Sequence, residues 1–243
     1  MDIHAVGCAP EELSTVRMID QGIIAKCYEL CARWFGVEEL QCLVRIIVVG
    51  GDFPLAKLPR KVGYLFQRRC RGCWIYELDA VFVRLYEDHI GSSMCETVFH
   101  ELIHALIGLA SRGYPYPCVV EEGMLCLAEA HLGVLLTERT WTPWGHVVSI
   151  RNLLRVDHRQ FLGMSHMERL EFVALAEKVC EFLALWFKCK PGALGLLDRL
   201  RRLRPSRDKL AKGIARERLV TPRKLDEAFC FFLKKGALSE PCR

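Results

Sequence analysis

The chain has 243 residues, of which 51% are hydrophobic and 26% charged, and its net charge is +5 at pH 7. This length and apolar content can bury a sizeable core, and no apolar run reaches the roughly 18 charge-free residues of a membrane span. The first residues lack the basic and apolar regions of a secretory signal. The 13 cysteines are typical of reduced, mostly buried thiols in a cytoplasmic protein.

The N-terminal part predicts one helix and then several strands. A helix is expected from Pro10 to Phe35, because proline and two glutamates suit its first turn and Gly36 suits its end. Residues 43–50 are rich in β-branched side chains and predict a strand. A basic stretch, residues 57–71, follows, and then residues 73–78 and 81–86 predict two further strands.

The C-x-x-C pair Cys70 and Cys73 has two interpretations. Such a pair can be half of a zinc site or a redox pair, but a second pair at the spacing of a zinc ribbon is missing. We therefore expect a tight turn that precedes a strand.

Residues 97–111 predict a buried helix that carries the pattern His-Glu-x-x-His. Histidines at positions i and i+4 lie on one face of a helix, so His100 and His104 can reach the same metal ion. Glu101 lies beside this face, where it can take a proton from an attacking water. Apolar residues cover the rest of the helix, which predicts one polar face on an otherwise buried element.

A catalytic zinc site usually needs a third protein ligand, and residues 120–129 supply candidates on a second predicted helix. The first helix can finish near Gly113, and a proline-rich turn can bring the chain back. Glu121 and Glu122 both qualify, although Glu121 also suits the positive end of the helix dipole. Glu129 lies two turns after Glu122 and could orient a ligand or could be a surface acid.

These two motifs resemble those of the gluzincin metallopeptidases, the broad group of thermolysin-like and aminopeptidase-like zinc proteases. More closely, residues 100–105, 113–115 and 120–123 are similar to the peptidase domain of plant ubiquitin-activated LIM-domain peptidases, which limit organ growth. The chain shows no recognisable ubiquitin-interacting motif and no complete LIM domain. Activation by ubiquitin is therefore not expected.

The resemblance implies a site and a fold. His100, His104 and Glu122 would bind one Zn²⁺ per chain and Glu101 would be catalytic, with Glu122 preferred to Glu121 because Glu-Gly matches the family pattern. The fold would be α+β and zincin-like, with a small mixed sheet packed on the His-Glu-x-x-His helix and a mainly helical C-terminal part. We expect residues 1–140 to hold the metal site and residues 141–243 to form a helical subdomain of the same catalytic unit.

A zinc peptidase also needs a hydrogen-bond donor for the oxyanion of the tetrahedral intermediate. Related gluzincins use a tyrosine or histidine from farther along the chain, and the long helix expected at residues 167–188 has Phe172 and no tyrosine. The candidate donors are Tyr114, Tyr116, His131 and His146.

The C-terminal helices are basic, since residues 199–224 hold eleven Lys or Arg against Asp208 and Glu217. Such a run is usually a solvated helix face, and it can also be a docking surface for nucleic acid, acidic protein or anionic lipid. The sequence therefore predicts a cytoplasmic zinc peptidase acting on a protein or peptide. The alternative is an inactive protease-like scaffold, which would bind a protein or nucleic-acid partner through these helices and would not need Glu101.

Overall fold

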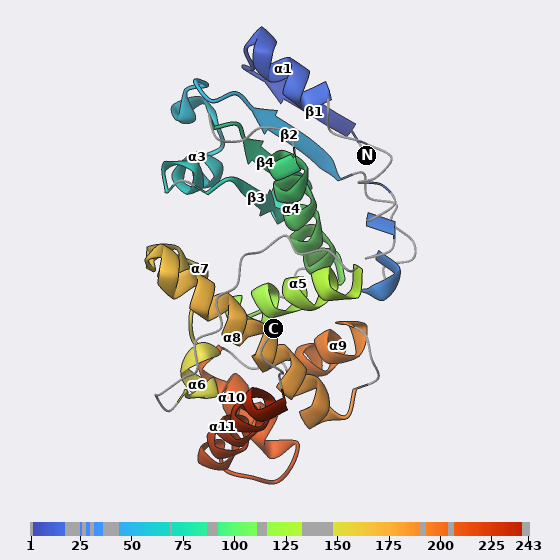
Figure 1. Ribbon diagram of the computed structural model, residues 1–243, viewed down its shortest axis with the longest axis vertical. Helices are drawn as coiled ribbons and strands as arrows, with labels where there is room; N and C mark the ends of the chain where they lie inside the picture. Colours follow the sequence, from blue (N-terminus) through green and yellow to red (C-terminus); the bar gives the residue numbers. More distant parts are fainter. Residues whose placement is uncertain are drawn as a thin grey trace. The chain divides into compact units, whose positions relative to one another are not determined.

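The structure, a computed structural model, describes residues 2–17, 25, 28–29, 32–35, 44–68, 70–86, 92–110, 116–132, 148–189, 193–203 and 207–239. Its contacts divide the chain into two compact units, Met1–Gly113 and Tyr114–Arg243. The strands belong to the first unit, and the described elements of the second unit are helices (Figure 1). The predicted α+β class is therefore confirmed.

The contacts divide the chain between residues 113 and 114, whereas the predicted division lies between residues 140 and 141. Contacts group the helix that carries Glu122 with the C-terminal helices. The predicted division instead separated a part with the whole metal site from the rest, and it stays a prediction.

The first unit is built on a four-stranded mixed sheet in the order β1-β2-β4-β3. Strands β1, β2 and β4 are parallel, and β3 runs antiparallel to β4 at one edge. Its elements are β1 (Asp2–Val6), α1 (Pro10–Arg17), β2 (Arg45–Val49), the short η1 (Leu55–Lys57), α3 (Arg60–Gln67), β3 (Gly72–Ile75), η2 (Tyr76–Leu78), β4 (Ala80–Arg84) and α4 (Ser92–Ala110).

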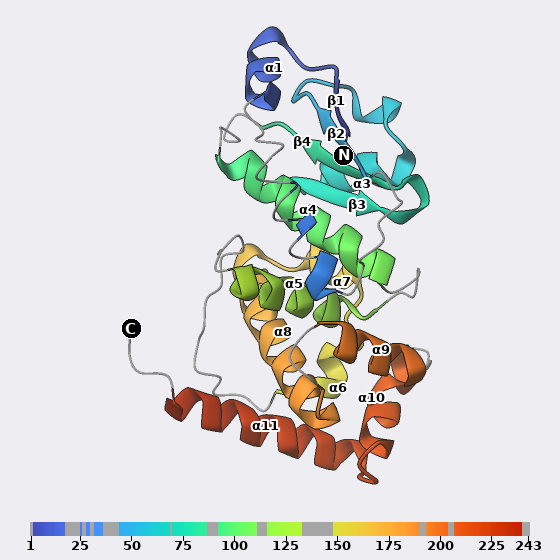
Figure 2. The same cartoon turned by 90° about the vertical axis from the view of Figure 1, so that its right-hand side faces the viewer.

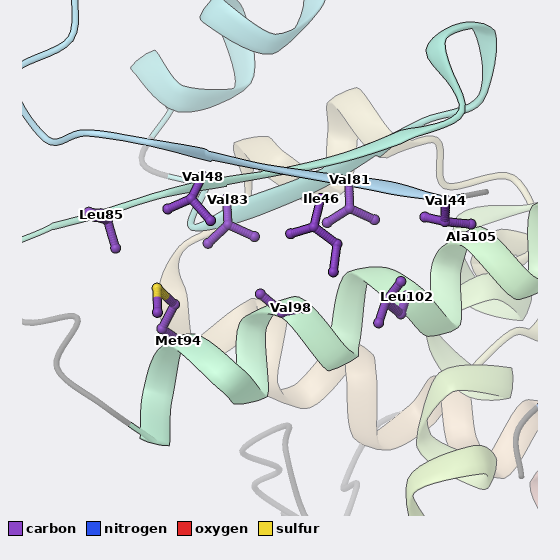
Figure 3. Close-up of a cluster of buried hydrophobic side chains, with 10 residues drawn as sticks. All are labelled: Val44, Ile46, Val48, Val81, Val83, Leu85, Met94, Val98, Leu102 and Ala105. Carbon is purple, nitrogen blue, oxygen red and sulfur yellow. The ribbon is translucent and has the colours of Figure 1, made fainter. Parts of the chain in front are cut away.

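The two faces of this sheet support different helices, because side chains alternate along each strand. From β2, Ile46 and Val48 face α4, where they pack with Val98 and Leu102 (Figure 3). The alternate residues of the strands pack on the other face, against α3. The expected small mixed sheet packed on the His-Glu-x-x-His helix is present, with α4 as that helix.

Several N-terminal elements differ from the prediction. Strand β1 was not predicted, and the basic stretch contains helix α3. The predicted strand 73–78 ends at Ile75, where η2 begins and leads to Asp79 in the left-handed region, with φ 45°. The predicted helix from Pro10 is present as α1 to Arg17, and much of its later part lies outside the described residues.

The second unit contains the remaining helices, and its long helix agrees with the predicted 167–188. That helix, α8, begins with a capping box in which the backbone N–H of Glu168 donates to Ser165 and Glu168 accepts from the Ser165 N–H. The helices are α5 (Cys118–Leu132), α6 (Ile150–Leu153), α7 (His158–Gly163), α8 (His166–Phe187), α9 (Ala193–Leu203), α10 (Arg207–Arg216) and α11 (Pro222–Ser239).

Membrane-spanning helices were not expected. Among the described residues, every helix is too short or too polar to cross a bilayer.

Candidate metal centre

Helix α4 presents the two histidines on one face. The rings of His100 and His104 lie one turn apart, with centroids separated by 5.0 Å and planes inclined at 67°. Both histidines are partly exposed, as are Thr97 and Gly108 at the same helical spacing, whereas most of the apolar residues of α4 are buried. The predicted polar face on a buried helix is therefore confirmed.

The environment of His100 favours the form of imidazole that binds metals. Desolvation by burial lowers the pKa of His100 to about 4, so its ring is neutral at pH 7. A neutral ring has a nitrogen lone pair to offer a metal, whereas an imidazolium has none. The protein around α4 thus disfavours a charged histidine at this position.

Glu101 lies directly over the edge strand β3. Its side chain is 8% exposed. A Cβ atom added to Gly72 would come within 2.6 Å of the Glu101 Cγ and 3.0 Å of its Oε1. Only a glycine leaves this space, so Gly72 determines where the Glu101 carboxylate can lie. In the sequence Gly72 is only a residue between Cys70 and Cys73, so this role was not predicted.

The C-x-x-C pair spans the start of a strand, so only its first two residues precede β3, whereas the prediction placed the motif in a turn before it. Residues 70 and 71 lead directly into β3, and Cys73 is buried in it. Burial, then the nearby Glu101 and Cys70, raise the pKa of the Cys73 thiol well above its usual range. A protonated thiol is a poor metal ligand, and within the described part of the chain neither cysteine joins a group of potential metal ligands.

Helix α5 holds the acidic candidates in two different settings. Glu121 is partly exposed, and its carboxylate lies 3.0 Å from Nε2 of His158. Glu122 is 6% exposed, and Glu129 is fully buried. Because Glu121 already has a basic partner on α7, the setting favours Glu122 as the metal ligand.

Burial makes Glu122 sensitive to a nearby cation. Desolvation raises the pKa of Glu122 to about 7, although the Coulombic effect of His158 lowers it. At pH 7, a carboxyl group with this pKa is present in both its neutral and its charged form. A divalent cation would favour the charged form, so metal binding and ionisation of Glu122 are linked.

Gly123, the second residue of the Glu-Gly pair, has a packing role. A Cβ atom at Gly123 would lie 2.1 Å from the Ala176 carbonyl oxygen and 2.6 Å from the Cys180 Sγ, both on α8. The Cys180 thiol also donates to the Val120 carbonyl at 3.6 Å. Glycine therefore lets α5 approach the backbone of α8, and this contact fixes the helix that carries Glu122.

The three predicted zinc ligands lie on two helices, with His100 and His104 on α4 and Glu122 on α5. Two imidazole nitrogens and one carboxylate oxygen are a donor set that suits zinc with a fourth position left open.

The four predicted oxyanion donors have different outcomes. Tyr114 and His146 lie outside the described residues. Tyr116 is buried, and its hydroxyl donates to the Leu197 carbonyl at 2.8 Å, which leaves no proton for an oxyanion. His131 is exposed in the last turn of α5. Phe172 of α8 packs against Phe161, with ring centroids 5.2 Å apart.

Comparisons of the chain with protein-family models, curated proteins and solved structures find no match. The resemblance to gluzincins therefore rests on the motif residues themselves. The function must be argued from the chemistry of those residues.

Proposed function

We propose that this chain is a zinc-dependent metallopeptidase of the gluzincin type, with a zincin-like fold and a protein or peptide substrate. His100, His104 and Glu122 bind one Zn²⁺, and Glu101 is the general base. The observation that carries the proposal is the pair of imidazoles one turn apart on the partly exposed face of α4, with Glu101 next to them, together with the buried Glu122 carboxylate on α5. When bound, zinc supplies a Lewis acid that polarises a carbonyl and lowers the pKa of water.

The burial of the Glu122 carboxylate supports this assignment. A buried carboxylate is costly unless a cation or hydrogen bonds compensate its charge, and Glu122 is held at a pKa of about 7. The neutral His100 ring adds no positive charge that would compete with a metal ion. The residues present thus fit zinc better than Ca²⁺ or Mg²⁺, which prefer oxygen ligands alone.

Glu101 has the position that the reaction requires of a general base. It is next to His100 on α4 and is held over β3 by the space at Gly72. From there its carboxylate takes a proton from the attacking water and later delivers that proton to the leaving amine. The described cysteines are all free thiols, which supports a cytoplasmic location for the enzyme.

The test measures zinc content and peptide cleavage on the same samples of wild type, Glu101→Gln and His104→Ala. We expect about one zinc per wild-type chain, and its loss in His104→Ala. Glu101→Gln should keep its zinc and lose cleavage by about 10²- to 10⁴-fold.

Glu96→Gln is the matched control, because Glu96 is an exposed glutamate on the same helix. It should keep both zinc and cleavage. If the wild-type protein binds no zinc, the proposal is wrong, and His100 and His104 have a structural role instead. Zinc binding without any cleavage of a peptide library would favour the inactive scaffold.

A further inference from the structure

The turn between α10 and α11 exposes a leucine in a backbone conformation that leucine disfavours. Leu219 is 96% exposed and has a φ of 54°. The Val220 N–H donates to the Ala215 carbonyl and the Leu219 N–H to the Arg216 carbonyl, which together form a Schellman motif at the end of α10. Glycine is usual at the position of Leu219, so neither backbone geometry nor burial explains this leucine.

The turn is held in place, so Leu219 is presented by a fixed backbone. Arg218 donates from Nε to the Trp186 carbonyl at 2.8 Å, and its guanidinium lies 5.0 Å from the centroid of the Trp186 ring. The Trp186 indole in turn donates to the Ile214 carbonyl at 3.1 Å. These contacts tie the turn to α8 and to α10.

Helix α11 continues from this turn, and its inner face is fixed within the second unit. Leu225 and Phe229 are buried, and Phe229 packs with Phe182 of α8 at a centroid distance of 5.3 Å. Asp226 accepts hydrogen bonds from Arg151 and Ser149. In Figure 2, α11 runs along one side of the helices of this unit. The opposite face of α11 is therefore its exposed face.

The exposed face and the turn combine cations with apolar side chains. Residues 216–235 contain six Lys or Arg against three acids. Of these acids Asp226 is buried, and Glu217 and Glu227 are paired with Arg199 and Arg223. Phe231 is 60% exposed, and the Lys235 Nζ lies 4.9 Å from its ring centroid. We call this the α11 surface, with the exposed residues Leu219, Arg223, Lys224, Phe231, Lys234 and Lys235.

We propose that the α11 surface docks on an anionic membrane. Clustered Lys and Arg on a helix are attracted to anionic headgroups, and exposed Leu and Phe beside them can enter the boundary of the acyl chains. Cations alone would fit a nucleic-acid backbone equally well, but that partner offers no apolar layer for Leu219. The combination of cations with the exposed Leu219 and Phe231 side chains therefore favours a bilayer surface as the partner. This proposal does not depend on the peptidase.

The test is flotation of the full chain with vesicles of phosphatidylcholine, with and without phosphatidylserine. We expect binding only with phosphatidylserine, and weaker binding at high salt. Leu219→Gly should lower the binding constant at least about tenfold, although glycine suits the left-handed backbone and should not harm folding. Phe231→Ser should act in the same direction.

Charge variants separate the α11 surface from net charge. Lys234→Glu with Lys235→Glu should abolish binding, whereas Lys57→Glu with Arg60→Glu, an equal charge change on the first unit, should not. Two results would overturn the proposal. The first is vesicle binding that Leu219→Gly leaves unchanged. The second is tight binding to a short DNA duplex that depends on Lys234 and Lys235 but not on Leu219, which would assign the surface to nucleic acid.

Discussion

Helices α4 and α5 carry the proposed metal ligands in different surroundings. Helix α4 packs on a sheet and keeps a partly exposed face that holds His100 and His104. Helix α5 is buried along most of its length and packs closely on α8. The first helix presents two imidazoles on a partly exposed face, and the second holds a carboxylate in a medium that disfavours its charge. The comparison shows that the same proposed site depends on two kinds of packing, which mutations can perturb separately.

The largest expected effect tests the packing of α5. Gly123→Ala places a methyl group 2.1 Å from a backbone oxygen of α8, which a rotamer change cannot relieve. We expect the free energy of unfolding to fall by about 3 kcal/mol. Urea unfolding followed by the helical circular-dichroism signal measures this change.

Gly163→Ala in α7 is the matched control for Gly123→Ala, because a Cβ atom there would have no neighbour within 4 Å. It should be neutral or slightly stabilising. Equal stability of the two variants would show that the contact between α5 and α8 is looser than the structure has it.

The second prediction concerns the charge that α5 holds. Because the pKa of Glu122 is raised from 4.5 to about 7 in the folded protein, its contribution to stability is present below pH 4.5 and is lost as the pH rises through 7. The metal-free protein should lose about 2 kcal/mol of stability from this group between pH 5 and pH 8.

Urea unfolding of chelator-treated protein at these two pH values checks the prediction. Glu122→Gln should remove this part of the pH dependence. Added zinc should restore the stability of wild type at pH 8, since the ion favours the carboxylate. A wild type and a Glu122→Gln variant with the same pH dependence would contradict the raised pKa.

The third prediction concerns the contact between α4 and β3. Gly72→Ala would force the Glu101 side chain to move, since its Cγ lies 2.6 Å from the added methyl group. If Glu101 is the base, kcat should fall about tenfold, which corresponds to about 1.4 kcal/mol, while zinc content stays the same. Peptide cleavage and metal analysis on the same sample separate these effects. Loss of zinc together with activity would instead point to a general distortion of α4.

The sequence predicted α4 better than its surroundings for a physical reason. The polar positions of α4 recur at helical spacing, so the sequence itself shows which face is exposed. The role of Gly72 depends on a contact between β3 and α4, which the local pattern of a C-x-x-C pair cannot show. Strand β1 has only five residues and pairs with β2, far along the chain, so its pattern is weak.

Helix α5 could be predicted as a helix, but its contacts could not. Its apolar residues surround it on all sides, so periodicity does not identify which glutamate faces inward. The choice of Glu122 over Glu121 came from the Glu-Gly pattern, and the structure adds a reason for the pattern, since Gly123 touches α8. The ion pair of Glu121 with His158 joins two helices that are far apart in the sequence, so no local pattern predicts it.

The smallest expected effect belongs to that ion pair. The Glu121 and His158 side chains are partly exposed, so the pair contributes little to stability. Glu121→Gln and His158→Ala should each lower the free energy of unfolding by less than about 1 kcal/mol and leave zinc content unchanged. Metal analysis of Glu121→Gln beside Glu122→Gln sharpens the comparison, because only the second variant should lose zinc. If Glu121→Gln lost the metal instead, the third ligand would be the residue on the partly exposed side of α5, and the buried carboxylate would have a structural role.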